Sequence, residues 1–131
     1  MAVQVELKRI IITETSDQQV IYLKEVGGER AFPIVIGKNE AEAIDRRLKG
    51  LPTPRPQTHE LLSDVIEKLD SRLERIVIND LQEHTFYARL VMRHAGKTVE
   101  VDSRPSDAIA LGVANNVPIF VAEHVMDEVG S

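Results

Sequence analysis

The sequence predicts one compact α+β domain in which two antiparallel β-meanders pack against helices. Runs of strand length, many with alternating apolar and polar residues, occupy positions 3–36 and 75–102. Apolar residues at helical spacing lie between these two regions, at positions 41–51 and 61–69. The chain has 131 residues, of which 43% are hydrophobic, and this is enough to bury a core. We therefore expect a single domain that covers residues 1–131.

The first third of the chain predicts a meander of three strands. Residues 3–12 begin with strict alternation and end in an apolar run, and residues 20–26 follow a polar turn. A Gly-Gly pair then leads into residues 31–36. Because Pro33 cannot donate a hydrogen bond to a neighbouring strand, we expect this third strand at a sheet edge or a bulge.

The next segment predicts an amphipathic surface helix that ends at Gly50. Asn39, followed three residues later by Glu42, resembles a capping box at the start of a helix. Apolar residues recur on one side, and we expect the charged side to be solvated. The apolar set is Ala41, Ile44, Leu48 and Leu51, and the charged set is Glu40, Asp45, Arg46 and Arg47.

Three prolines within residues 52–56 predict a stiff, extended connector to a second helix. Thr58 is expected to cap this helix, which would place Arg55, Thr58 and His59 together at an anion-attracting helix N-terminus. Alternatively, the prolines only set the angle between two helices and Arg55 is a surface charge. The apolar stripe of the helix, typical of a face packed on a core, comprises Leu61, Leu62, Val65, Ile66 and Leu69.

A second meander follows, with strands expected at residues 75–81, 85–93 and 98–102. In its central strand, side chains two residues apart share a face. Phe86, Ala88, Leu90 and Met92 form one face, and Tyr87, Arg89, Val91 and Arg93 form the other.

The last strand of this meander leads into a polar turn and an almost wholly apolar helix. Pro105 suits the first helical position, and Asn115-Asn116 can end the helix in a left-handed conformation. A short strand at 119–121 would then run parallel to the strand before the helix, by the rule for right-handed crossovers. Residues 123–129 predict a terminal helix.

The polar residues of the buried helix all lie at its N-terminus. Arg104, Ser106 and Asp107 would there share a small volume with unpaired backbone N–H groups, an arrangement that can hold an anion such as a phosphate. The alternative is structural, because an acidic residue in a first turn is often a cap and an Arg beside an Asp is often an ion pair.

Three segments of the chain resemble the bifunctional nuclease family, which carries a DNase-RNase domain. They are RPSDAIALG with Asp102 before it and PIFV after it, PRPQTHELL at 54–62, and PIVIGKNEAEAI at 33–44. The resemblance implies hydrolysis of phosphodiester bonds in both DNA and RNA. It also implies a homodimer with a groove lined by the first two of these motifs.

Phosphodiester cleavage needs an activated nucleophile, a positive group near the phosphate and an acid for the leaving oxygen. In a nuclease we therefore expect arginines as phosphate clamps, carboxylates as bases or metal ligands, and a histidine as acid-base group. A divalent metal such as magnesium, held by Asp102 and Asp107, is left open. The candidate catalytic residues are His59, Asp102, Arg104 and Asp107, and the candidate substrate-binding residues are Arg55, Thr58 and Ser106.

Composition limits the other classes of function. The absence of cysteine excludes disulfides, thiolate zinc sites and a thiol nucleophile, and suits a reducing cytoplasm. We expect neither export nor a membrane span. No histidine pair has the i, i+4 spacing of a zinc site, and no Gly-rich phosphate loop is present. The net charge of −5 opposes nucleic-acid binding, so a competing hypothesis is a non-enzymatic binding or regulatory module with an anion-binding helix N-terminus.

Overall fold

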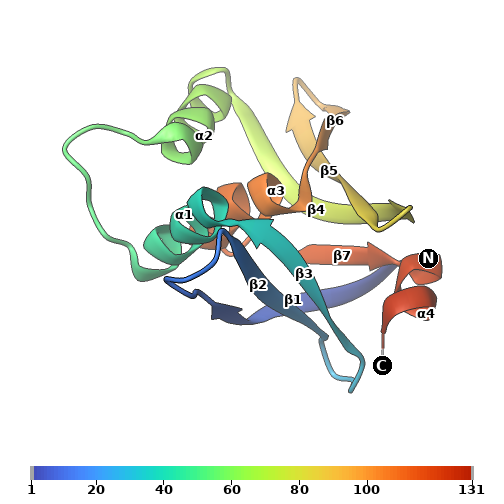
Figure 1. Ribbon diagram of the computed structural model, residues 1–131. Coiled ribbons are helices and arrows are strands. Elements are labelled where there is room, and N and C mark those ends of the chain that lie inside the picture. Colours follow the sequence, from blue (N-terminus) through green and yellow to red (C-terminus); the bar gives the residue numbers. More distant parts are fainter. Residues whose placement is uncertain (1, 131) are drawn as a thin grey trace.

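The computed structural model describes residues 2–130 and confirms the α+β class. In this range the chain forms a single compact domain with one mixed sheet of seven strands and four α-helices (Figure 1). The strands are β1 Ala2–Ile11, β2 Gln18–Glu25, β3 Ala31–Gly37, β4 Ser71–Gln82, β5 Thr85–His94, β6 Lys97–Ser103 and β7 Ile119–Ala122. The helices are α1 Lys38–Lys49, α2 Thr58–Lys68, α3 Pro105–Gly112 and α4 Glu123–Val129, with a 3₁₀ turn at Val113–Asn115.

Both predicted meanders are present, and β7 joins them into one sheet of order β3-β2-β1-β7-β4-β5-β6. Strand β7 runs antiparallel to β1 and parallel to β4. Because β5 is antiparallel to both β4 and β6, strands β6 and β7 run in the same direction. The predicted parallel orientation of the strands on either side of α3 is therefore confirmed.

The sheet curves strongly around the core. Phe32 on the edge strand β3 and Phe86 on β5 belong to opposite halves of the sheet, yet their rings stack with centroids 5.7 Å apart. The face predicted for β5 is confirmed, since Ala88 and Leu90 are buried in this core. Pro33 lies on an edge strand, as its missing N–H predicts.

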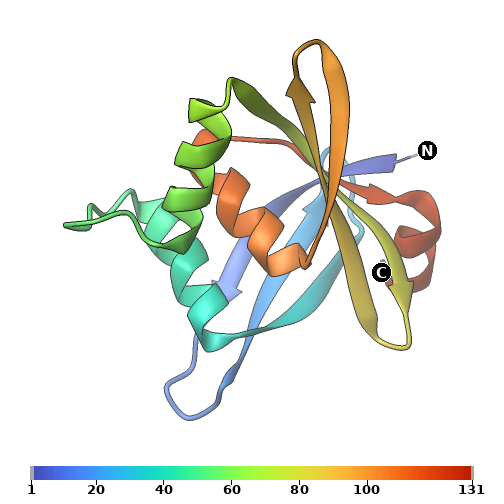
Figure 2. The ribbon, with the colours of Figure 1, turned by 90° about the horizontal axis from the view of Figure 1, so that it is seen from above.

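Helices α1, α2 and α3 lie together on one side of the sheet, and α4 packs at another end against β1, β4 and β7 (Figure 2). Helix α3 is the central one, because it contacts α1, α2 and the sheet. It approaches β4 so closely that a Cβ at Gly112 would lie 2.6 Å from Cδ1 of Ile76. None of the helices within residues 2–130 is long and apolar enough to cross a membrane.

Both predicted helix caps are wrong by one or two positions. Helix α1 begins at Lys38 after the N-cap residue Gly37, so Asn39 already belongs to the first turn and makes no capping box. In α2 the N-cap is Gln57 rather than Thr58, and Glu60 Oε1 accepts the Gln57 N–H at 3.1 Å. The helix thus has a capping box, and its N-cap lies one residue before the predicted cap, Thr58.

The apolar stripe of α2 does not face the core. Leu61, Leu62, Val65 and Leu69 are between 40% and 62% exposed, and of the stripe only Ile66 packs against the core. Polar residues at its N-terminus instead attach α2 to the neighbouring helices, as described below. Strand β4 also begins four residues earlier than predicted, at Ser71.

Candidate active site at the N-terminal end of helix α3

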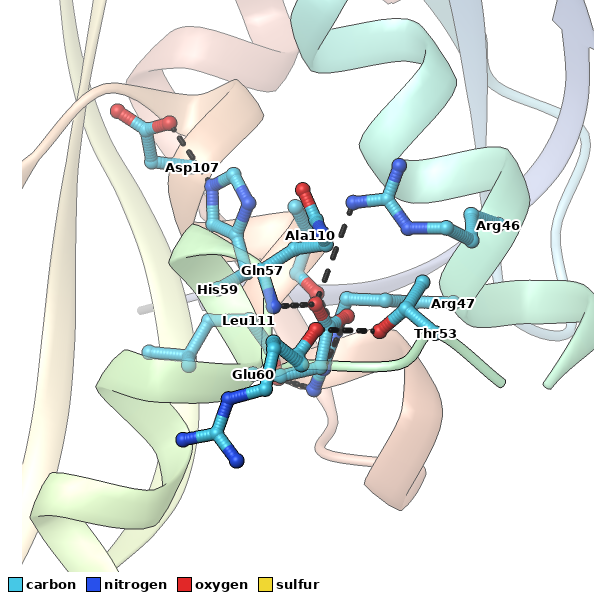
Figure 3. Close-up of polar contacts among 10 residues, drawn as sticks. Arg46, Arg47, Thr53, Gln57, His59, Glu60, Asp107, Ala110 and Leu111 are labelled. Carbon is cyan, nitrogen blue, oxygen red and sulfur yellow. Dashed lines mark hydrogen bonds and ion pairs between the residues drawn. The ribbon is translucent and has the colours of Figure 1, made fainter. Parts of the chain in front are cut away.

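A chain of four charged or titratable side chains connects the three clustered helices. Arg104, the N-cap residue of α3, donates to both oxygens of Asp107, from Nε to Oδ2 at 2.9 Å and from Nη2 to Oδ1 at 3.1 Å. Its Nη2 also lies 3.5 Å from Glu40 Oε2 on α1. His59 Nε2 on α2 is 3.1 Å from Asp107 Oδ1 (Figure 3). We call Glu40, His59, Arg104 and Asp107 the Arg104 cluster.

The cluster holds Asp107 in its charged form. Burial opposes ionisation of this carboxylate, but the hydrogen bonds from Arg104 and His59 outweigh burial and lower its pKa. The same bond to Asp107 raises the pKa of Arg104. The Arg104 side chain is 62% exposed, and its Nη1 makes no hydrogen bond to any residue that the structure describes. Arg104 therefore keeps a donor for a ligand.

A groove of about 540 Å³ lies beside this cluster, between edge strand β3 and the N-terminal end of α3. Its lining includes Gly37, Arg104 and Ser106. Gly37 is the N-cap residue of α1 and Arg104 that of α3, so the N-terminal ends of both helices border the groove. Helix N-termini carry unpaired N–H groups and partial positive charge. Ser106 is only 5% exposed and lies at the second position of α3. The end of α1 is already faced by the Glu40 carboxylate, whose Oε1 lies beside Gly37, so the end of α3 is the one that can accept an anion.

A second cluster lies at the other end of α3. Arg47 on α1 donates to the carbonyl oxygens of Ala110, from Nε, and Leu111, from Nη2 at 3.0 Å, and its Nη1 donates to Glu60 Oε2 at 3.0 Å (Figure 3). Burial opposes the charged form of Glu60, but Arg47 outweighs burial and lowers its pKa. We call Arg47, Glu60 and these two carbonyls the Arg47 cluster.

The prediction of a solvated charged face on α1 is wrong for Arg47, which is buried. The sequence did contain a signal for this. Arg47 follows Ala43 by four residues and Ile44 by three, and both are buried, so Arg47 lies at the border of the buried face. A charge count alone could not detect it.

The structure brings only some of the predicted site residues together. His59, Arg104 and Asp107 are joined directly, and Ser106 lines the groove together with Arg104. Arg55 and Thr58 are exposed, and no side-chain hydrogen bond or ion pair to either is present in the described range; the Arg55 carbonyl accepts from Thr53 Oγ1 at 2.7 Å.

Asp102 points away from Asp107. It is exposed on β6 and pairs across the sheet with Arg89 of β5, on the face opposite the buried Ala88 and Leu90. Asp107 lies on the helical side. No group of three metal-binding side chains is found in the part of the chain that the structure describes.

The fold and this site together define a small α+β domain with an anion-attracting, arginine-bearing groove. More narrowly, the chain belongs to the bifunctional nuclease domain family, which residues 20–131 match.

Related proteins agree with this assignment. An uncharacterised protein of Mycobacterium tuberculosis (strain ATCC 25618 / H37Rv) is 39% identical over 127 residues, which cover 97% of this chain and 76% of that protein. Bifunctional nuclease 2 of Oryza sativa subsp. japonica is 27% identical over 114 residues, or 84% of this chain and 35% of the relative. Bifunctional nuclease 1 of the same rice is 24% identical over 118 residues, which cover 87% of this chain and 36% of that relative. The chain thus spans about a third of these plant relatives.

Proposed function

We propose that this protein is a nuclease that hydrolyses phosphodiester bonds in both DNA and RNA. The observation that carries the proposal is the pairing of His59 with Asp107 beside Arg104 at the positive end of α3. An imidazole, a positive group and helix N–H donors are the chemical groups that this reaction needs. The names of the rice relatives, bifunctional nucleases 1 and 2, support the same activity.

In this proposal the scissile phosphate lies in the groove beside β3. One phosphate oxygen accepts from Arg104 Nη1, and others accept from the N–H and hydroxyl of Ser106. Asp107 orients His59, which transfers a proton to or from the reacting oxygens, as a carboxylate-held imidazole does in other hydrolases. Arg55 and Thr58, exposed near the N-terminus of α2, are proposed contacts for flanking phosphates.

A divalent metal receives no step in this mechanism. Both oxygens of Asp107 already accept hydrogen bonds from cationic or imidazole nitrogens, and Asp102 lies on the opposite face of the sheet. This donor set fits a magnesium ion poorly, because that ion needs several converging oxygens. Asp102, two residues before Arg104 in the chain, is proposed only as the alternative catalytic carboxylate to Asp107, because it lies on the other face of the sheet.

The test is cleavage of labelled single-stranded RNA and double-stranded DNA by purified wild type and variants, with and without EDTA. Arg104→Ala and His59→Ala should each lower the cleavage rate by about 100-fold or more while the melting temperature stays near that of wild type. The cleavage rates of Asp102→Asn and Asp107→Asn show which of the two carboxylates the reaction requires. Arg72→Ala is the matched control, because Arg72 is also exposed and paired with a glutamate, Glu74.

Equal cleavage by wild type, Arg104→Ala and Arg72→Ala would contradict the proposal and identify a contaminating nuclease. The second candidate function, a non-enzymatic binding or regulatory module, would then be favoured. It is supported by the net charge of −5 and by the two hydrogen bonds between Arg104 and Asp107, which resemble a structural ion pair. Such a module would bind an anion at the N-terminal end of α3 without turnover.

We also infer that the protein forms a homodimer in the cytoplasm. The exposed leucines and valine of α2 provide an apolar surface that a second copy could cover. A cysteine-free sequence suits a reducing compartment. Size-exclusion chromatography with light scattering tests the dimer, and fluorescence microscopy of a tagged protein tests the compartment.

A further inference from the structure

A second cleft, of about 470 Å³, lies on the face of the sheet opposite the helices. Its floor is formed by three neighbouring strands, β7, β4 and β5, where Val77 lies between Phe120 and Arg89 in the cross-strand register. These residues alternate with Ile76, Ile78 and Ala88, which are buried on the helical side. We call this the outer cleft; its lining is Ala2, Arg75, Val77, Asn79, Arg89, Val91, Glu100 and Phe120.

Asn79 is an unusual residue in this lining. The register between β4 and β5 shifts between Ile78 and Asp80, so Asn79 is the extra residue of a β-bulge. Its Oδ1 is buried and has no hydrogen-bond partner within residues 2–130. Leaving a buried acceptor unpaired costs about 1–3 kcal/mol, and bulges often direct a side chain toward a functional site. A ligand that donates to Oδ1 after the Asn79 side chain rotates toward the cleft would remove this cost.

The rest of the lining has two arginines, one carboxylate, Glu100, and an aromatic ring. Arg75 is exposed and forms no ion pair with any described residue, and Arg89 donates from Nη1 to Glu100 Oε1 at 2.9 Å. Phe120 and Val77 provide apolar surface. The outer cleft therefore combines a ring to stack on, a hydrogen-bond acceptor and two guanidinium groups, in a volume within the usual range for small-molecule sites of roughly 300–1,000 Å³.

We propose that the outer cleft binds a nucleotide whose base carries an exocyclic amino group. The base stacks on Phe120 and its amino group donates to Asn79 Oδ1, while Arg75 and Arg89 contact the phosphate. A free mononucleotide and a nucleotide within a single strand share this chemistry. The site is separate from the Arg104 cluster, and its occupancy requires no cleavage, so it does not depend on the proposed nuclease activity.

The first experiment compares cytidine and uridine monophosphates, which differ mainly in an amino group replaced by an oxygen. Titration calorimetry should give a several-fold lower Kd for cytidine monophosphate, since one hydrogen bond contributes about 1 kcal/mol. Backbone amide shifts in nuclear magnetic resonance spectra should change in β4, β5 and β7. Both measurements are repeated in Arg104→Ala, which removes binding in the groove beside α3 and should leave the outer cleft unaffected.

Variants then test the role of each group. Asn79→Leu, of similar size but without an acceptor, should abolish the preference for cytidine, whereas Asn79→Asp keeps the acceptor and should retain the preference. Arg75→Gln should weaken the binding of both monophosphates equally and should reduce the salt dependence of that binding. Arg72→Gln is the control for an exposed arginine on the same strand, and it should change neither the affinity nor its salt dependence. Melting temperatures establish that each variant is folded.

A second arm distinguishes the two sources of the nucleotide by comparing ten-residue oligocytidine with oligouridine. Asn79-dependent binding of the oligomer without binding of the monophosphate assigns the site to a strand, and binding of both assigns it to free nucleotides as well. Equal affinity for cytidine and uridine ligands in wild type, or a preference that survives in Asn79→Leu, would overturn the proposal.

Discussion

The two ends of helix α3 carry the same chemistry in different surroundings. At the C-terminal end, the Arg47 side chain is 6% exposed, and its Nε, Nη1 and Nη2 all donate to protein oxygens. At the N-terminal end, the Arg104 side chain is 62% exposed and retains a free Nη1 among the described contacts. Both arginines bind a carboxylate, and in both cases the carboxylate pKa is lowered.

This difference shows that an arginine-carboxylate pair does not by itself distinguish a structural site from a functional one. Arg47 caps the carbonyl end of α3, where a positive charge is favourable, and has nothing left to offer a ligand. Arg104 lies at the opposite end, where a positive charge is unfavourable to the helix but attracts an anion. We therefore expect changes at Arg47 to reduce stability and changes at Arg104 to reduce activity.

The largest expected effect is that of Arg47→Ala. It leaves Glu60 Oε2 and two helix carbonyls without the Arg47 donors, so the free energy of unfolding should fall by about 3–5 kcal/mol. Arg104→Ala breaks a more exposed pair and should cost about 1 kcal/mol or less. Urea denaturation followed by circular dichroism measures both. Equal losses for the two variants would eliminate the proposed distinction between the clusters.

The carboxylate partners provide a second comparison. Glu60→Gln weakens a charge-assisted bond to a buried arginine and should cost about 1.5–3 kcal/mol. Glu40 lies 3.5 Å from the exposed Arg104, so Glu40→Gln should cost about 0–1 kcal/mol. The same denaturation measurement applies. A larger loss for Glu40→Gln would mean that the Arg104 cluster is the structural one.

Acid should remove the contribution of Asp107 to stability. Its folded-state pKa lies below the ordinary value of 3.8, so its charge stabilises the folded protein at pH values above that number and the benefit is lost as pH falls through the lowered pKa. The difference in free energy of unfolding between wild type and Asp107→Asn should be constant near neutral pH and shrink below about pH 4. Glu60→Gln serves as reference, because the pKa of Glu60 is also lowered. A difference that grows on acidification would contradict the assignment.

The sequence predicts the strands, α3 and α4 well because their signals are local. Alternation in β5, the Pro105 helix start and the left-handed Asn116 all have direct backbone consequences. It predicts the direction of β7 because crossover handedness is general. The grouping of His59, Arg104 and Asp107 follows in part from position, since each lies in or next to the first turn of a helix.

The orientation of α2 and the burial of Arg47 could not be predicted in this way. An apolar stripe normally identifies the face that packs on a core, yet α2 attaches through His59 and Glu60 and exposes Leu61 and Val65. The bonds that decide this join residues 13 to 64 positions apart. Periodicity within one helix contains no information about such partners.

The smallest effect on the isolated fold is expected at the exposed stripe of α2, and it tests whether both clusters lie beside a dimer interface. Val65→Lys adds a charge to a surface that is half-exposed in the single chain, so the free energy of unfolding per chain should change by only about 0.5 kcal/mol. Burying that lysine against a second copy would cost far more. Light scattering should therefore give the mass of two chains for wild type and of one for Val65→Lys.

Asp64→Asn is the matched control, because it changes the net charge by the same +1 on the exposed adjacent residue outside the stripe. It should leave the dimer intact. A single-chain mass for wild type would contradict the dimer. A dimer that survives Val65→Lys would place the interface elsewhere. If wild type is a single chain, both clusters act within that chain, because α2 supplies His59 to the Arg104 cluster and Glu60 to the Arg47 cluster. The comparison between Arg47 and Arg104 then requires no partner subunit.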